Sequence, residues 1–264
     1  MAGARPNLAN PFILDLTPEG TWGLRFWVTT RQGGVSRGPF ATLNLSFAVP
    51  DDPEAVAENR RRVLAALGLG PERLVGAEQV HGVSVAVVGP TDAGRAPIPA
   101  TDGLVTAAAG LFLFVQVADC YPVVVFDARQ RVVGLAHCGW RGTLRGLPAK
   151  LVQTMVRVLG SRPADLWAVI GPGIGPCCYE VGPDVAGAAR LRLPHPQEAL
   201  TARENRTFLD LPAAIDQWLK AAGLVPDRIA RCGLCTACRT DIFYSHRAEC
   251  GLTGRFWAVA GFEG

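Results

Sequence analysis

Three consecutive apolar segments in the middle of the chain decide the fold: "LFLFVQVADC" (Leu111–Cys120), "YPVVVFD" (Tyr121–Asp127) and "RVVGLAHCGW" (Arg131–Trp140). Short valine-rich runs of this kind, bounded by turn residues, are typical of buried β-strands. Asp119 and other polar residues interrupt the longest apolar stretch, so it is too short and too polar to cross a bilayer. The centre of the chain is therefore predicted to be a set of adjacent strands.

Working outward, the same criteria predict more strands and three amphipathic helices. The strands are Thr21–Thr30, Val83–Gly89, Asp102–Thr106, Leu166–Gly173, Arg228–Gly233 and Arg255–Phe262, and the helices are Asp51–Gly68, Pro148–Leu159 and Phe208–Gly223. Asp52 is suited to cap the first helix, with Pro53 in its first turn and Gly68 at its end. No linker or repeat divides the sequence. We therefore expect one mixed α/β domain over residues 1–264, in which residues 1–20 form a partly irregular N-terminal extension.

Composition excludes several classes of function. The 264 residues are 49% hydrophobic and 19% charged, with a formal charge of +3 and no basic block, which argues against nucleic acid or a membrane surface as partner. The N-terminus has no apolar run of signal-peptide length, and eight cysteines without such a signal indicate reduced thiols. We expect a cytoplasmic monomer whose partners are small molecules.

Three potential metal ligands stand where strands or turns end. His81 lies in "EQVHG", Cys120 in "VADCYP" and His137 in "AHCGWRG". Imidazole nitrogen and thiolate sulfur are preferred zinc ligands, and a catalytic zinc keeps three protein ligands and one open position. However, such histidines are often structural and such cysteines are often small core residues. The wide spacing leaves both interpretations open.

The order of several motifs resembles one known family. These motifs are "TTRQGGVSRGPFATLNL", "EQVHG", "VADCYPV", "AHCGWRG", "GPGIGPCCYEVG" and "FYSHR…TGRFWAVAG", spread from Trp22 to Phe262. They resemble the proteins long called multicopper polyphenol oxidases or laccase-like proteins, now better described as purine nucleoside phosphorylases with adenosine deaminase activity. The resemblance implies stacked mixed sheets between helices (α/β/β/α), similar to a deamidating-toxin fold with a Cys/His pair. It also implies zinc, rather than copper, bound by His81, Cys120 and His137.

The resemblance further implies phosphorolysis of adenosine, inosine and methylthioadenosine, with nucleoside and phosphate as ligands. Arg141, four residues after His137, would hold the anion, because a guanidinium matches phosphate with a rigid fork of donors. Arg31 and Asn44 are further candidates for substrate contact. His81, Cys120, His137 and Arg141 are thus the predicted catalytic set, with Glu78 or Asp119 available to orient a ligand or move a proton.

Three other functions compete with this one. In the first, Cys120 is the nucleophile of an amide hydrolase, acting on cell-wall precursors, with a histidine as its base. In the second, the protein oxidises phenols with copper, although four scattered histidines cannot build the trinuclear site of true multicopper oxidases. In the third, the chain is a scaffold with a structural zinc, which would normally need four ligands.

The remaining cysteines suggest a cluster that we do not expect to form. Cys232, Cys235, Cys238 and Cys250 resemble the start of an iron–sulfur motif, but the usual final cysteine followed by proline is missing. We expect reduced thiols there, and a fortuitous second metal site is the alternative. "GPGIGPCCYE" (Gly171–Glu180) lacks phosphate-loop spacing, and its two prolines remove amide donors, so it is predicted to be a tight turn near the active site.

Overall fold

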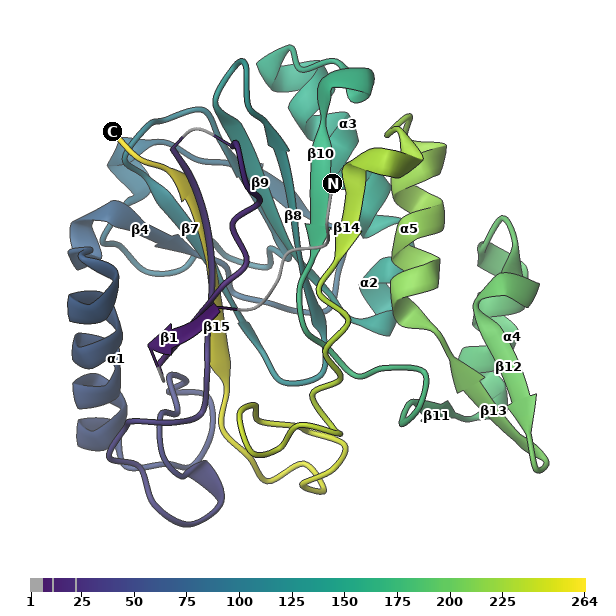
Figure 1. Ribbon diagram of the computed structural model, residues 1–264, viewed down its shortest axis with the longest axis horizontal. Coiled ribbons are helices and arrows are strands. Elements are labelled where there is room, and N and C mark those ends of the chain that lie inside the picture. Colours follow the sequence, from purple (N-terminus) through teal and green to yellow (C-terminus); the bar gives the residue numbers. More distant parts are fainter. Residues whose placement is uncertain (1–6, 11, 22) are drawn as a thin grey trace.

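Two six-stranded sheets form the centre of this computed structural model, which describes residues 7–10, 12–21 and 23–264 (Figure 1). The first sheet has the order β1 (Asn7–Asn10), β2 (Ile13–Asp15), β3 (Leu24–Thr29), β15 (Phe256–Phe262), β7 (Phe112–Val117) and β4 (Leu74–Gly76). The second has the order β14 (Ile229–Arg231), β10 (Trp167–Ile170), β8 (Tyr121–Asp127), β9 (Val132–Cys138), β6 (Gly103–Thr106) and β5 (Val85–Val87). Both sheets mix parallel and antiparallel pairs.

The alternation of side chains along β8 explains the layers. Val124 and Phe126 face the core between the two sheets, whereas Val123 and Val125 face a second core formed with α3 (Leu147–Leu159) and α5 (Leu211–Ala221). Because both faces of β8 are buried, its sequence is apolar throughout. The predicted strand and helices in this region are confirmed to within a few residues.

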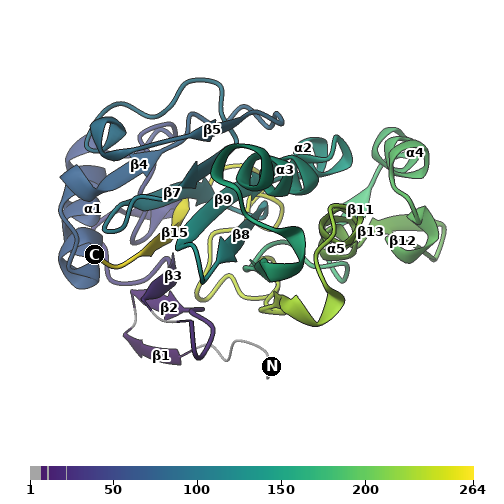
Figure 2. The ribbon, with the colours of Figure 1, turned by 90° about the horizontal axis from the view of Figure 1, so that it is seen from above.

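The outer face of the first sheet is covered by α1 (Pro53–Leu67), which packs Val63 against Trp257 and Val259. Asp52 caps this helix by accepting a hydrogen bond from the Glu54 amide at 3.0 Å, and Gly68 ends it in the left-handed region. The order helix, sheet, sheet, helix is seen from above in Figure 2. The predicted mixed α/β/β/α arrangement is confirmed.

Several elements were not predicted. α2 (Trp140–Leu144) follows β9 directly, and α4 (Pro183–Arg192) lies at the edge of the molecule beside a small sheet of β11 (Glu180–Val181), β13 (Arg206–Leu209) and β12 (Leu200–Arg203) (Figure 1). The buried residues of α4 are only Val185, Ala186 and Ala189. Its sequence therefore lacks the apolar periodicity by which α1, α3 and α5 were predicted.

The N-terminal strands β1 and β2 fall inside the predicted extension, which is thus partly regular. Residues 1–6, Pro11 and Trp22 lie outside the described residues, so the predictions that cover them are not tested there. The boundaries of a single domain at 1–264 stay a prediction.

The candidate functional residues Cys120 and His137 lie where the chain passes from one sheet to the other. β7 belongs to the first sheet and β8 to the second, so Ala118–Cys120 crosses between them, with Asp119 at φ 83°. β9 runs antiparallel to β8 and pairs His137 with Pro122, which brings His137 next to this crossing. In the described part of the chain, no helix is long and apolar enough to cross a membrane.

Candidate active site

A cavity of about 700 Å³ opens at this crossing, a volume in the range of small-molecule sites. His81, Cys120, His137 and Arg141 all line it. The structure therefore brings together the four residues that the sequence analysis placed in the catalytic set. The predicted tight turn at "GPGIGPCCYE" is also confirmed, and it contributes Ile174 to the cavity wall.

The ligand atoms of His81, Cys120 and His137 all lie within 4.8 Å of one another. The two imidazole rings are 4.8 Å apart between centroids and nearly perpendicular, at 75°. His137 is buried, Cys120 is half-buried and His81 is exposed, so the group has a protein side and an open side. Two nitrogens and one sulfur at this separation suit a single metal ion with a position left for substrate or water.

A buried carboxylate that the sequence analysis missed holds two of these candidate ligands, His81 and His137, in place. Asp102 is fully buried just before β6, and its Oδ1 lies 2.9 Å from His137 Nδ1. The same carboxylate accepts hydrogen bonds from the amides of Val80, His81 and Gly82 at 3.2, 3.0 and 2.6 Å. His81 has a left-handed backbone (φ 57°), a conformation that costs energy and is held by these contacts. Asp102 thus fixes Nδ1 of His137 as the protonated nitrogen and leaves Nε2 free for a metal.

Without a metal, Cys120 and His137 form a thiolate–imidazolium pair. Burial raises the pKa of Cys120, but the neighbouring His137 and His81 outweigh it and lower this pKa to about 6. Burial lowers the pKa of His137, but the Cys120 thiolate and the Asp102 carboxylate raise it to about 9. The thiolate that a metal requires is therefore formed at neutral pH.

Two glycines explain the spacing of the "AHCGWRG" motif. A Cβ atom on Gly139 would lie 2.9 Å from Cys120 Sγ and 3.1 Å from the ring of His81. A Cβ atom on Gly142 would lie 2.7 Å from the Gly82 carbonyl oxygen. The segment after His137 therefore passes so close to Cys120, His81 and Gly82 that only glycine fits at these two positions.

Three arginines give the cavity a positive wall. Arg141 lies in the first turn of α2, stacks on Trp140 with its guanidinium carbon 4.5 Å from the ring centre, and has no ion pair among the residues that the structure describes. Arg247 and Arg255, which the sequence analysis did not single out, also line the cavity. Arg255 is anchored to the carbonyl groups of Thr253 and Gly254 at 2.9 and 2.8 Å. Such a wall is suited to an anion.

Arg31 and Asn44 lie outside the cavity lining. The Arg31 guanidinium is bound to the Ala41 carbonyl at 3.0 Å and to Glu249 Oε1 at 2.9 Å. Asn44 is fully buried, and its Oδ1 accepts hydrogen bonds from the amides of Ser46 and Arg255 at 3.1 and 2.9 Å. Because Ser46 and Arg255 do line the cavity, Asn44 is placed to position them rather than to touch substrate.

Glu78 and Asp119, the two acidic candidates of the sequence analysis, both line the cavity. Asp119 is occupied on both oxygens, since Oδ1 accepts from the Thr236 hydroxyl at 2.6 Å and Oδ2 from the Arg247 amide at 2.7 Å. Glu78 Oε2 accepts from the Ala100 amide at 3.0 Å. Asp119 therefore holds the surrounding loops together, and Glu78 is the better placed of the two to exchange a proton with substrate.

Comparisons with known proteins identify related sequences. Residues 25–263 match the family described as multi-copper polyphenol oxidoreductase laccase. The chain is 40% identical over 243 residues to purine nucleoside phosphorylase YlmD of Geobacillus stearothermophilus, covering 89% of this chain and 88% of that protein. It is 43% identical over 237 residues to a purine nucleoside phosphorylase of Deinococcus radiodurans, covering 88% and 87%.

Solved structures show the same relationship. The crystal structure of YlmD from Geobacillus stearothermophilus superposes with a TM-score of 0.95 at 36% identity, covering 99% of this chain and 100% of that one. A Neisseria meningitidis protein matches with a TM-score of 0.83 at 30% identity, covering 96% and 100%. With nearly its whole length matched in both sequence and fold, the chain belongs to the laccase-like polyphenol oxidoreductase family, whose curated relatives here are named purine nucleoside phosphorylases.

Proposed function

We propose that this chain is a zinc-dependent purine nucleoside phosphorylase that also deaminates adenosine. The observation that carries the proposal is the meeting, in one cavity, of the His81–Cys120–His137 group with the Arg141 guanidinium. Relatives named purine nucleoside phosphorylase support the reaction class. The further assignments to adenosine, inosine and methylthioadenosine, and to zinc, are part of the proposal.

The donor set fits zinc. His137 is held in one tautomer by Asp102, and Cys120 is already ionised at neutral pH, so two ligands are prepared for a cation. A bound zinc ion would supply Lewis-acid chemistry at the open side of the group. Copper binds similar donors, so the metal is to be identified by analysis of the purified protein.

The side chains of the cavity divide the work of phosphorolysis. In this reaction the bond from C1′ to the purine nitrogen breaks, a bond from C1′ to a phosphate oxygen forms, and the leaving purine takes up a proton. Arg141, together with Arg255, would bind the phosphate and keep it in place. Glu78 is proposed to hold the proton for the purine or, in deamination, to accept one from the attacking water.

Incubation of metal-analysed protein with adenosine, with and without phosphate, tests this function. Chromatography should show adenine and ribose 1-phosphate only when phosphate is present. Ammonia from deamination should appear in both mixtures, with inosine as its partner product without phosphate and inosine together with hypoxanthine when phosphate is present. A Cys120→Ala protein at the same concentration is the control for contaminating enzymes. Unchanged adenosine in both mixtures, with zinc bound, would refute the proposal.

One observation favours a second function, that of a cysteine amide hydrolase. Asp102, His137 and Cys120 form a carboxylate–imidazole–thiolate series with a lowered pKa at Cys120, as a nucleophile requires. The two functions differ in their need for metal, because zinc would occupy the thiolate. Chelation should abolish phosphorolysis, whereas it should preserve or increase amide hydrolysis and alkylation of Cys120.

The proposed partners follow from this chemistry. They are a nucleoside and phosphate, without nucleic acid or membrane. The cytoplasmic location and the monomeric state expected from the sequence stay predictions, and size-exclusion chromatography with light scattering measures the latter.

A further inference from the structure

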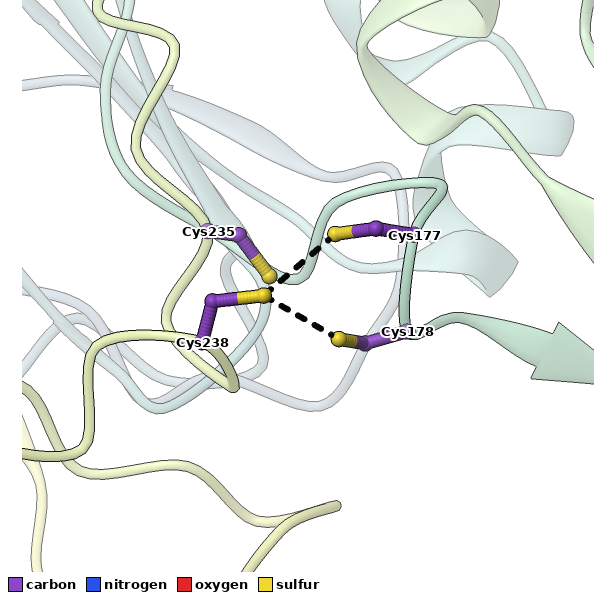
Figure 3. A group of neighbouring side chains, drawn as sticks. All are labelled: Cys177, Cys178, Cys235 and Cys238. Carbon is purple, nitrogen blue, oxygen red and sulfur yellow. Dashed lines mark hydrogen bonds between the residues drawn. The ribbon is translucent and has the colours of Figure 1, made fainter.

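Four cysteines from two distant segments meet away from the cavity. Cys177 and Cys178 belong to the turn that follows β10, and Cys235 and Cys238 belong to the segment that follows β14. β10 and β14 are parallel neighbours, with Ile170 opposite Arg231, so the segments after both strands leave the sheet at the same edge. Figure 3 shows the four sulfur atoms pointing toward one another.

The sulfur positions match the size of a metal ion. Cys238 Sγ lies 3.5 Å from Cys177 Sγ and 3.4 Å from Cys178 Sγ. All four sulfur atoms lie within 4.8 Å of one another. A tetrahedral zinc with Zn–S bonds of about 2.3 Å separates its sulfur ligands by about 3.8 Å. A disulfide needs about 2.05 Å and joins only two of the four sulfurs.

Backbone hydrogen bonds independently hold the two segments together. The Gly175 amide donates to Cys235 Sγ at 3.2 Å, an interaction that favours a thiolate. The Gly173 amide donates to the Leu234 carbonyl at 3.4 Å, and the Thr236 amide donates to the Gly173 carbonyl at 3.0 Å. The sulfur atoms are therefore brought together by the main chain as well as by their side-chain rotamers.

We propose that Cys177, Cys178, Cys235 and Cys238 bind a second metal ion, of the zinc class, in a closed four-thiolate site. Thiolates are soft ligands that select zinc over the hard cations magnesium and calcium. Four protein ligands leave no open position, so the ion is structural. The two segments supply a Cys-x-x-Cys pair and an adjacent pair, and the sequence expectation of unligated thiols changes accordingly.

The four-cysteine site lies between two segments that help to form the cavity. The first segment carries Ile174 and Tyr179 into the cavity wall, and the second carries Thr236, which donates to Asp119 beside Cys120. The Ile174 amide also donates to the Asp119 carbonyl at 2.9 Å. A metal at the four-cysteine site would clamp these segments and so fix one wall of the cavity without touching substrate.

Zinc content of protein purified under reducing conditions and saturated with zinc tests the proposal. The parent should hold about two zinc ions per chain, Cys238→Ser and Cys120→Ala about one each, and the double variant close to none. Cys250→Ser removes an exposed cysteine outside both groups and is the matched control, expected to match the parent. A parent with a single zinc that Cys238→Ser retains would overturn the proposal.

A second measurement decides the case if Cys238→Ser fails to fold. In Cys120→Ala, added cobalt(II) should give intense thiolate-to-metal charge-transfer absorption that saturates at about one ion per chain, as expected for four sulfur ligands. Zinc should also raise the thermal midpoint of this variant by several degrees. No cobalt band, or a disulfide within the group that persists under reducing conditions, would overturn the proposal. The result does not depend on whether the protein acts on nucleosides.

Discussion

The His81–Cys120–His137 group and the four-cysteine site both gather potential metal ligands, but they are built in different ways. The first mixes nitrogen with sulfur, is ordered by the buried Asp102, and faces a cavity. The second contains only sulfur, lies close to the surface, and is ordered mainly by main-chain hydrogen bonds. Metal sites with three protein ligands and an open side are typically catalytic, and those with four protein ligands are typically structural. We therefore expect loss of the first group to abolish activity and loss of the second mainly to lower stability.

The largest effect is expected from Cys120→Ala. This variant should lose the cavity metal and with it nearly all phosphorolysis, while the metal of the four-cysteine site and the fold remain. Zinc analysis, circular dichroism and adenine release measured on the same preparation check this. Full activity with the cavity metal absent would show that the His81–Cys120–His137 group is not a catalytic metal site.

Arg141→Ala should lower kcat/KM for adenosine and phosphate about a hundredfold, or roughly 2–4 kcal/mol of transition-state stabilisation, and keep both metals. The reason is that Arg141 has no ion pair within the described structure and is free to hold the anion. Arg141→Lys should recover little, because a point charge does not reproduce the planar fork. A parental rate in Arg141→Ala would leave Arg141 without a role in substrate binding.

Asp102→Asn should weaken zinc binding at the cavity by about 10- to 100-fold, because the orienting carboxylate beside His137 is lost. The four-cysteine site, which has no contact with Asp102, provides the internal control within the same molecule. Competition with a coloured chelator resolves the two affinities. Equal weakening of both sites would indicate general unfolding rather than loss of orientation.

Zinc affinity at the cavity should depend on pH. Between pH 6 and 9 the metal-free group holds a Cys120 thiolate and a protonated His137, since their pKa values are about 6 and about 9. Zinc must displace the His137 proton, so affinity should rise about tenfold per pH unit across this window and level off above it. Zinc titrations of Cys238→Ser at several pH values measure this, and a flat profile from pH 6 to 9 would contradict the assigned protonation states.

The smallest effect is expected from Cys238→Ser on catalysis. Loss of the proposed structural metal should raise KM for adenosine severalfold and lower the thermal midpoint, with kcat nearly unchanged. The reason is that none of the four cysteines lines the cavity, whereas Ile174 and Tyr179 of the same segment do. Steady-state kinetics below the unfolding temperature separate the two constants. A collapse of kcat in a folded Cys238→Ser protein would show that the four-cysteine site is not merely structural.

The strands and helices that could be predicted from the sequence are those with clear local patterns. The apolar runs around Cys120 and His137 predicted their strands, and the caps Asp52 and Gly68 predicted α1. The three candidate metal ligands stood out in their motifs, but only the resemblance to a known family joined them into one predicted zinc site. In each case the signal is contained in a few neighbouring residues, which is what a single sequence displays.

The unpredicted part depends on contacts between distant segments. Asp102 is 35 residues from His137, and only the pairing of Gly103 with Ala136 reveals that they are neighbours. Cys178 and Cys238 are 60 positions apart and meet only because β10 and β14 pair in parallel. Strand register is not readable from one sequence when both faces of the strands are apolar.

The central claim is that the cavity metal, and not the second metal, supports phosphorolysis. It is tested most directly by stripping the Cys238→Ser protein with a chelator and adding zinc back in steps, with bound zinc and phosphate-dependent adenine release measured in parallel. Activity should be absent in the stripped protein and should return in proportion to zinc, reaching its maximum at about one ion per chain. Stripped protein that releases adenine at the zinc-loaded rate would contradict the account.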